Sequence, residues 1–313
     1  MTWLFEQLHR ALDEVAMWLE DQVVRPPAPF RAAAPGPLAC FGPLPPLPAL
    51  PAGAGPWSAP SPWPGAPPLT VHVSPAGRAA RGVAVLVPPW KIRRAGLLDG
   101  WRAALKACGH DVWLVVPPFH LDRTAPGARG GEGFVGPDLE ALRGAVSQSV
   151  LELRLVCALA AARGGTPALV GLSLGGLTAA LAATCPESPT SLALIAPALD
   201  LHAVLARTRI GRRYRALAEQ AGAPLPPDEA VAAMLAPFDP GARPPVARRV
   251  FLASGRQDGV ATRRGHLPLT RGWGVTPRAY DRGHLTLLFG CRQVRTDLAA
   301  FLTAEPPTRF APL

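Results

Sequence analysis

From residue 69 onward, the sequence alternates short β-branched runs with longer stretches of helical character. Parallel strands need crossover connections, which are usually helices, so this alternation predicts β-α-β units and a mostly parallel sheet. The expected strands are residues 69–73, 82–87, 111–116, 168–172, 192–196, 250–254 and 275–280. The expected helices between them are residues 95–108, 137–163, 175–184 and 285–303. The sequence therefore predicts an α/β fold with a central, mostly parallel sheet flanked by helices.

The chain before residue 69 has a different character. Residues 1–25 contain no proline and carry apolar side chains at spacings of three and four, which predicts an amphipathic helix. Its other face is largely acidic, whereas a membrane-surface helix is usually rich in Lys and Arg. We therefore expect it to pack on the protein body or on a second copy, so that a homo-oligomer could form through it. Residues 26–68 hold 16 of the 39 prolines and are expected to form an extended, Pro-rich connector.

Residues 199–247 interrupt the alternation within the α/β domain expected over residues 69–313. They contain two expected helices with Pro and Gly joints, and we interpret them as a lid-like insertion above the sheet edge. The insertion carries a dense arginine run made of Arg207, Arg209, Arg212, Arg213 and Arg215. These arginines could bind an anionic group of a ligand or form a solvated face.

Charge and composition argue against several classes of function. The formal net charge is +10, but the arginines are otherwise dispersed and no recognisable nucleic-acid module accompanies them, so no nucleic-acid partner is predicted. The five cysteines are widely spaced and include no Cys-x-x-Cys pair, which favours free thiols in a reducing compartment. The histidines lack metal-ligand spacing, and Gly164-Gly165 is not followed by the Lys and Ser/Thr of a phosphate loop. We therefore predict no metal and no cofactor.

Two membrane signals are also missing from the sequence. No apolar run reaches the roughly 18 residues needed to span a bilayer. The N-terminus lacks a basic segment followed by an apolar one. We therefore expect no transmembrane segment and a cytoplasmic protein.

One short motif combines a strand end, a tight turn and a helix start. Gly171-Leu172-Ser173-Leu174-Gly175-Gly176 follows the apolar run at 168–170 and opens the helix-forming stretch at 177–183. In a nucleophile elbow, such a turn pushes the serine hydroxyl out at the carboxyl end of its strand, and glycines are needed where a Cβ would clash. The motif predicts Ser173 as a nucleophile, and a plain Gly-rich strand-to-helix turn is the alternative.

A serine hydroxyl is a weak nucleophile until an imidazole accepts its proton and a carboxylate orients that imidazole. Asp258 and His284 each follow an expected strand, at the edge where open parallel sheets place their sites. The chain order Ser173, Asp258, His284 is the order found in α/β-hydrolases. Asp200, which follows an earlier strand, is the alternative acid, and we expect Asp281 to be a turn residue.

With these residues, the chain resembles the α/β-hydrolase superfamily over residues 69–303. Within that superfamily it looks like a subgroup of abhydrolase-domain proteins in which a Pro-Pro segment follows the third strand. The segments that carry the likeness are Leu86-Val87-Pro88-Pro89-Trp90, Pro117-Pro118-Phe119-His120, Gly171–Gly176, Asp258 and Gly283-His284-Leu285. The resemblance implies an α/β-hydrolase fold, a triad of Ser173, Asp258 and His284, and hydrolysis of an ester-type acyl bond.

The chain departs from many superfamily members after the third strand, where Pro-Pro-Trp-Lys stands in place of His-Gly. Proline has no backbone N–H, so an oxyanion hole would need the N–H of Leu174 together with that of Trp90 or Lys91. We expect Pro89 and Lys91 to border the pocket. His120 ends the other Pro-Pro segment, where it could border the same pocket or lie in a surface turn.

The predicted activity is that of a serine hydrolase that forms an acyl-enzyme. The expected substrate is a small-molecule or lipid acyl ester, and a thioester or an amide would use the same residues. The alternative is a non-catalytic binding or scaffold protein that retains the hydrolase fold and works through its N-terminal helix and Pro-rich arm.

Overall fold

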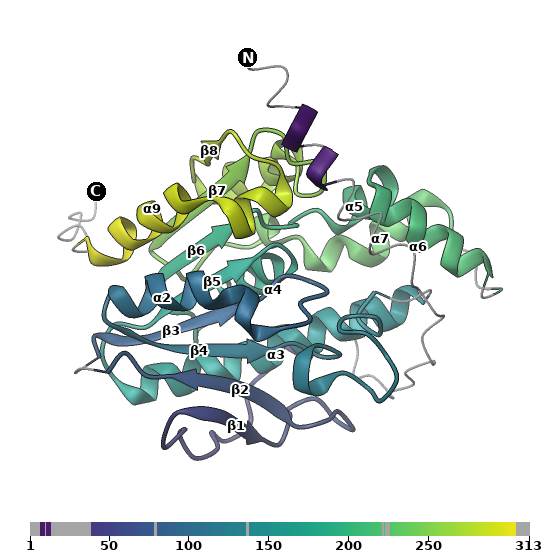
Figure 1. Ribbon diagram of the computed structural model, residues 1–313. Coiled ribbons are helices and arrows are strands. Elements are labelled where there is room, and N and C mark those ends of the chain that lie inside the picture. Colours follow the sequence, from purple (N-terminus) through teal and green to yellow (C-terminus); the bar gives the residue numbers. More distant parts are fainter. Residues whose placement is uncertain are drawn as a thin grey trace.

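The computed structural model describes residues 7–9, 11–13, 39–77, 80–135, 138–220, 222 and 226–304. The strands within them are β1 (Gly55–Ala59), β2 (Leu69–Ser74), β3 (Gly82–Val87), β4 (His110–Val116), β5 (Ala168–Leu172), β6 (Ser191–Ile195), β7 (Arg249–Gly255) and β8 (Arg278–Tyr280). They form one sheet in the order β1-β2-β4-β3-β5-β6-β7-β8 (Figure 1). β3 to β8 pair in parallel, and β1 and β2 are antiparallel additions at one edge. The predicted mostly parallel sheet is confirmed.

Helices cover both faces of the sheet. The helices that contribute side chains to the cores on its two faces are α2 (Asp99–Ala107), α3 (Leu139–Arg163), α4 (Leu174–Ala182), α8 (Leu267–Trp273) and α9 (Arg292–Thr303). Side chains alternate along a strand, so Val85 of β3 lies in the core beneath α3, α4 and α8, and its neighbour Leu86 lies in the core beneath α2 and α9. Because the central strands are buried on both faces, they appear in the sequence as continuous apolar runs.

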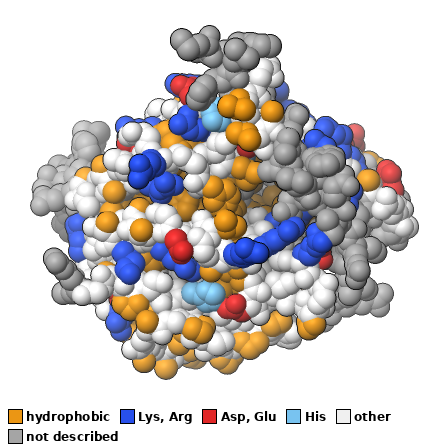
Figure 2. Space-filling model, viewed as in Figure 1, with side chains coloured by type: hydrophobic (Ala, Val, Ile, Leu, Met, Phe, Trp, Pro, Cys, Tyr) orange, Lys and Arg blue, Asp and Glu red, His pale blue; other side chains and the backbone are white. Residues whose placement is uncertain are grey.

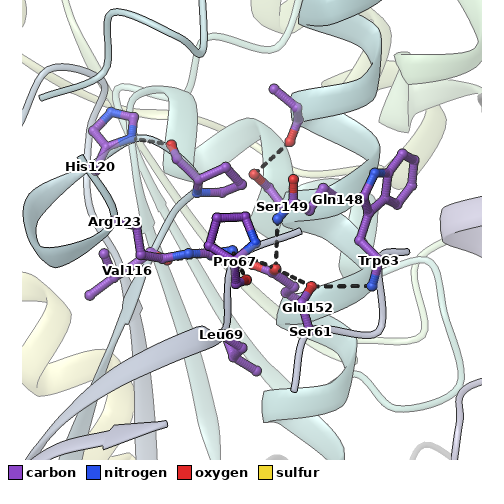
Figure 3. A network of polar contacts seen from close by, with 12 residues as sticks. Ser61, Trp63, Pro67, Leu69, Val116, His120, Arg123, Gln148, Ser149 and Glu152 are labelled. Atoms are coloured by element: carbon purple, nitrogen blue, oxygen red, sulfur yellow. Dashed lines mark hydrogen bonds and ion pairs between the residues drawn. The ribbon is translucent and has the colours of Figure 1, made fainter. Parts of the chain in front are cut away.

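The helix α3 is long and apolar, with a mean hydropathy of 1.5 over its most apolar window. Its length and composition would allow it to cross a membrane, but 83% of that window is buried inside the fold, as in the core helix of a globular domain. Its buried Glu152 is paired: the carboxylate accepts hydrogen bonds from Arg123 at 2.6 and 2.8 Å and from Gln148 at 2.8 Å (Figure 3). This pairing lets a charged residue lie inside an otherwise apolar helix.

The described part of the Pro-rich segment, residues 39–68, belongs to the folded body, which corrects for these residues the connector expected over residues 26–68. Within it, β1 forms the outermost strand of the sheet and pairs with β2. An edge strand tolerates Pro56 because one side of its backbone needs no N–H donor. The folded body therefore begins before residue 69, because proline excludes central strands but not edge strands.

Side chains also tie this segment to α3. Ser61 donates a hydrogen bond to the Glu152 carboxylate at 2.6 Å, and Trp63 beside it is buried (Figure 3). Arg154 donates to the carbonyl oxygen of Cys40 at 2.6 Å.

All five cysteines are buried free thiols, as predicted.

Parts of the N-terminal region lie outside the described residues. Residues 7–9 and 11–13 are helical. The rest of the helix predicted over 1–25, together with residues 26–38, is not described.

The insertion at 199–247 contains α5 (Leu201–Arg207), α6 (Arg209–Gln220) and α7 (Asp228–Leu235). The two expected helices are three in the structure, because a break at Thr208 separates α5 from α6. The hydroxyl of Thr208 accepts a hydrogen bond from the backbone N–H of Gly211 and so caps α6. Leu205 and Tyr214 of the insertion pack in one cluster with Leu177 of α4. The insertion therefore lies against the helix that follows Ser173.

The last two features of the fold are the distribution of charged side chains on the surface and a break in the last helix. On the face seen in Figure 2, Lys and Arg side chains are scattered in several groups among hydrophobic and neutral ones. The helix expected over 285–303 is divided into a π-helical turn at Thr286–Gly290 and α9. Such π-helical turns are often found near functional sites.

Candidate active site

Ser173 lies in a tight turn between β5 and α4, with φ 53° and ψ −114°. This backbone conformation is costly for a residue with a side chain. The turn is possible because its glycines leave room: a Cβ on Gly171 would lie 2.4 Å from the carbonyl oxygen of Gly175. A Cβ on Gly175 would lie 2.5 Å from the carbonyl oxygens of Val87 and Pro88. The hydroxyl of Ser173 is thereby held at the carboxyl end of the sheet, at the start of α4.

The structure brings the three predicted side chains together. Ser173 Oγ lies 2.8 Å from His284 Nε2, and His284 Nδ1 lies 2.7 Å from Asp258 Oδ2. All three residues are buried. With Asp258 ionised, the imidazole donates from Nδ1 to the carboxylate, and its Nε2 accepts the hydrogen bond from the serine hydroxyl.

The geometry distinguishes Asp258 from the alternative acids. Its second oxygen accepts hydrogen bonds from the backbone N–H groups of Val260 and Ala261 at 2.8 and 2.7 Å, which fix the carboxylate. Asp200 instead caps the start of α5, where it accepts a hydrogen bond from a backbone N–H. Asp281 is exposed and pairs with an arginine. Asp258 is therefore the carboxylate on the imidazole.

The surroundings of His284 favour its protonated form. Burial by itself lowers the pKa of the imidazole, but the adjacent Asp258 carboxylate, with a further contribution from Asp13, raises the pKa above its usual value. An imidazole with a raised pKa accepts a proton from a hydroxyl more readily. The ring is therefore suited to act as a general base once it is neutral.

The side chain of His120 fixes the loop that follows β3 through a hydrogen bond to its backbone. The Nδ1–H of His120 donates to the carbonyl oxygen of Pro118 at 2.8 Å, and its Nε2 accepts a hydrogen bond from the backbone N–H of Lys91 at 3.1 Å. Burial lowers the pKa of His120 to about 4, so the ring is neutral and Nε2 can accept. Trp90 Nε1 donates to the carbonyl oxygen of Gly131 at 2.8 Å, which fixes the same loop.

His120 therefore differs from both interpretations of the sequence. It is fully buried, so it is not a surface-turn residue. It lies behind the loop and not on the wall of the cavity that contains Ser173. The backbone N–H of Lys91 is engaged by His120, so of the two candidate oxyanion donors in this loop Trp90 fits better.

A cavity of about 280 Å³ opens onto Ser173 and His284. Pro89, Trp90 and Lys91 of the loop after β3 line it. Most of its other lining residues are apolar, and the sequence analysis named none of them as a pocket residue; they are Ile92, Leu97, Ile210, Val260, Leu285, Leu288 and Phe289. Their apolar character resembles that of core residues, so no local signal marks them.

Besides Lys91, two other charged residues within the described parts of the chain line the cavity. Arg213, a member of the arginine run, contributes from α6, and Asp13 contributes from the N-terminal segment. The run does not form one face: Arg215 donates to the carbonyl oxygens at the end of α5, and Arg212 is exposed. The sequence around Asp13 does not indicate that it belongs to the site. Its contact is with His284, which lies 271 residues later in the chain. Across the described ranges, no three His, Cys, Asp or Glu side chains gather as metal ligands do.

Solved structures of ester hydrolases share this architecture. A hyperthermophilic esterase from Pyrobaculum calidifontis matches with a TM-score of 0.52 at 16% identity, over 80% of this chain and 85% of that chain. A monoacylglycerol lipase from Paleococcus ferrophilus matches with a TM-score of 0.51 at 19% identity, over 75% and 98% of the two chains. An acetyl xylan esterase from Paenibacillus sp. R4 matches with a TM-score of 0.55 at 17% identity, over 75% and 79%.

Sequence comparison adds nothing to these structural matches, because no protein-family model and no curated protein sequence matches the chain. At the low identities of the structural matches, what they establish is the architecture. The parallel sheet, the turn at Ser173 and these similarities together confirm the fold predicted from the motifs. The chain has the α/β-hydrolase fold.

Proposed function

We propose that the protein is a serine hydrolase that cleaves carboxylic esters through an acyl-enzyme on Ser173. The observation that carries this proposal is the continuous hydrogen-bond chain from Ser173 through both ring nitrogens of His284 to Asp258, at 2.8 and 2.7 Å. The fold alone would not be sufficient, because the same fold serves unrelated functions. Structural similarity to an esterase and to an acetyl xylan esterase supports ester hydrolysis as the reaction.

The reaction proceeds in two halves. Ser173 Oγ attacks the acyl carbonyl carbon while His284 Nε2 accepts the hydroxyl proton, and the imidazolium then protonates the leaving alkoxide. The alcohol departs and the acyl group remains as an ester on the serine. Water then attacks this ester, with His284 again accepting a proton and returning it to the serine oxygen. Asp258 stays ionised throughout and stabilises the imidazolium.

The negative charge that develops on the carbonyl oxygen needs preorganised donors. We assign this role to the backbone N–H of Leu174 at the start of α4 and to that of Trp90. The amino-terminal end of α4 adds positive potential at the same place. His120 and Gly131 support the assignment, because their hydrogen bonds fix the loop that carries Trp90.

The cavity supports an apolar acyl group of modest size. Ligand pockets usually measure about 300–1,000 Å³, so a cavity of about 280 Å³ is slightly smaller than most of them. Its lining is largely apolar, which favours an acyl chain over a sugar or a nucleotide. We therefore expect short and medium-chain esters to be better substrates than long-chain or bulky ones.

Replacement of the nucleophile tests the proposal. The full-length protein should hydrolyse 4-nitrophenyl butyrate, and Ser173→Ala should lower kcat by about three or more orders of magnitude, because the covalent route disappears. A fluorophosphonate probe should label the wild-type protein and leave Ser173→Ala unlabelled. Ser58→Ala, which changes an exposed serine on β1, is the matched control and should behave as wild type.

Two outcomes would contradict the proposal. Hydrolysis at the wild-type rate by Ser173→Ala would remove the mechanism. Wild-type protein that neither hydrolyses the ester nor reacts with the probe would favour the non-catalytic alternative, in which the fold serves as a binding scaffold.

A further inference from the structure

The carboxylate of Asp13 accepts hydrogen bonds from the backbone of the loop that carries His284, although Asp13 and His284 are 271 residues apart in the sequence. One oxygen accepts a hydrogen bond from the backbone N–H of His284 at 2.5 Å, and the other accepts one from the N–H of Leu285 at 2.9 Å. Asp13 is only 6% exposed and lines the same cavity as Ser173. The N-terminal segment therefore contributes a charged side chain to the candidate active site.

The fit between the two segments is close. A Cβ on Gly283 would lie 2.3 Å from an oxygen of Asp13 and 3.1 Å from the carbonyl oxygen of His9, so only glycine leaves room for this contact. Burial raises the pKa of Asp13, and the hydrogen bonds from Leu285 and His284 oppose that rise. A buried carboxylate is costly unless it is well paired, and here both of its oxygens are paired with the same loop.

We propose that Asp13 is a positioning residue for the reaction: its carboxylate fixes the main chain of His284 and adds negative charge beside the imidazolium that forms in each half-reaction. The inference rests on the proposed function. Asp258 orients the ring from Nδ1, whereas Asp13 holds the backbone from which the ring extends. Both constraints keep Nε2 within reach of Ser173 Oγ, and a displacement of about 1 Å there can cost about 100-fold in rate.

The negative charge of Asp13 should affect the pH dependence of the reaction. A residue that only supports the structure of the loop would not have this effect. Among the described residues, the ionisable groups near the imidazole are Asp258, Asp13 and His266, with Lys91 and Arg213 on the cavity wall. Because Asp13 contributes to the raised pKa of His284, removal of its charge lowers that pKa. Only the neutral imidazole acts as the base, so activity is lost as the pH falls through this pKa. The acidic limb of kcat/KM should therefore move to lower pH in Asp13→Asn.

The experiment compares full-length variants with 4-nitrophenyl butyrate across a pH series. Asp13→Asn should lower kcat by about 10- to 100-fold with little change in KM, because an amide presents one acceptor where the carboxylate presents two. Asp13→Glu keeps the charge but displaces the contact, so it should lower kcat and leave the acidic limb near its wild-type position. If Asp13→Asn fails to fold, as judged by circular dichroism, the Asp13→Glu profile decides the question.

Asp281→Asn is the matched control. It removes the carboxylate of a residue three positions before His284, and this carboxylate is exposed and pairs with Arg256 at 2.8 Å. It should leave both kcat and the acidic limb unchanged. Three results would overturn the proposal: wild-type kcat in Asp13→Asn, a lowered kcat with an unmoved acidic limb in that variant, or the same shift in Asp281→Asn. If Asp13→Glu decides the question, wild-type kcat in that variant or a displaced acidic limb would overturn it.

Failure of this inference is distinguishable from failure of the proposed function. If Ser173→Ala is inactive and the wild-type protein reacts with the fluorophosphonate, the proposed function stands and only the role of Asp13 is at issue. If Ser173→Ala remains active, the proposed function fails, and the role of Asp13 in it fails as well.

Discussion

The Ser173 turn and the His284 loop face each other at the cavity, yet they are held by different kinds of contact. The serine turn depends on close backbone packing, since a Cβ on Gly171 or Gly175 would collide with carbonyl oxygens. The histidine loop depends on the side-chain carboxylates of Asp258 and Asp13. These residues are separated from His284 by 26 and 271 positions in the sequence. One side of the candidate site is therefore local and steric, and the other is long-range and electrostatic.

This difference teaches where each side is vulnerable. The serine turn has no room for an added atom, so it should be damaged by a substitution that adds one methyl group. The histidine loop should instead be damaged by isosteric substitutions that remove a charge and add no bulk. Variants of these two types separate the two halves of the site experimentally.

The largest effect is expected on the electrostatic side. Asp258→Asn should lower kcat by about 10²- to 10⁴-fold, because the amide supports neither the required tautomer nor the imidazolium. Asp200→Asn is the matched control and should change kcat little, since Asn caps a helix about as well as Asp does. Steady-state hydrolysis of 4-nitrophenyl butyrate measures both. A larger loss in Asp200→Asn would transfer the acid role to that residue.

The steric side should break when a methyl group is added to the turn. Gly175→Ala places a Cβ against the carbonyl oxygens of Val87 and Pro88, which are backbone atoms with no rotamer to change. We expect the free energy of unfolding to fall by about 1–3 kcal/mol. Activity should fall as well, because the displaced backbone leads directly into the Trp90 loop. Urea denaturation and ester hydrolysis measure the two effects.

A second glycine provides the control for this variant. Gly144 lies in α3, and a Cβ there would meet nothing within 4 Å. Gly144→Ala should raise the free energy of unfolding by about 0.5–1 kcal/mol through helix propensity alone. Equal stability changes in the two variants would show that the turn is not sterically closed.

The same contrast explains how much of the molecule could be predicted from sequence. The strands and the turn at Ser173 follow from apolar runs and glycine positions, which are properties of neighbouring residues. The edge strand β1 was missed because its single proline and its Pro-rich surroundings resemble a connector. The break at Thr208 was missed because a cap inside a helical pattern depends on how two helices meet in space.

Long-range contacts set the limit of prediction for the site. Asp258 and His284 could be predicted because each follows a strand, and strand ends meet at one edge of a parallel sheet. No such rule places Asp13 beside His284, and its neighbours in sequence suggest only an acidic helix face. His120 was predicted as a residue of the pocket or of a surface turn, and its buried position behind Lys91 depends on the packing of two loops.

The smallest expected effect concerns Arg213, which adds a positive charge to the wall of the cavity between the two sides of the site. Arg213→Gln should raise KM about two- to fivefold for an ester with a carboxylate on its acyl chain, such as 4-nitrophenyl hemisuccinate, because it removes one favourable charge interaction. KM for the neutral butyrate should not change. Arg212→Gln, at the adjacent exposed position, is the control and should affect neither substrate. Equal effects of Arg213→Gln on both esters, or none on either, would assign Arg213 to a solvated face together with Arg212.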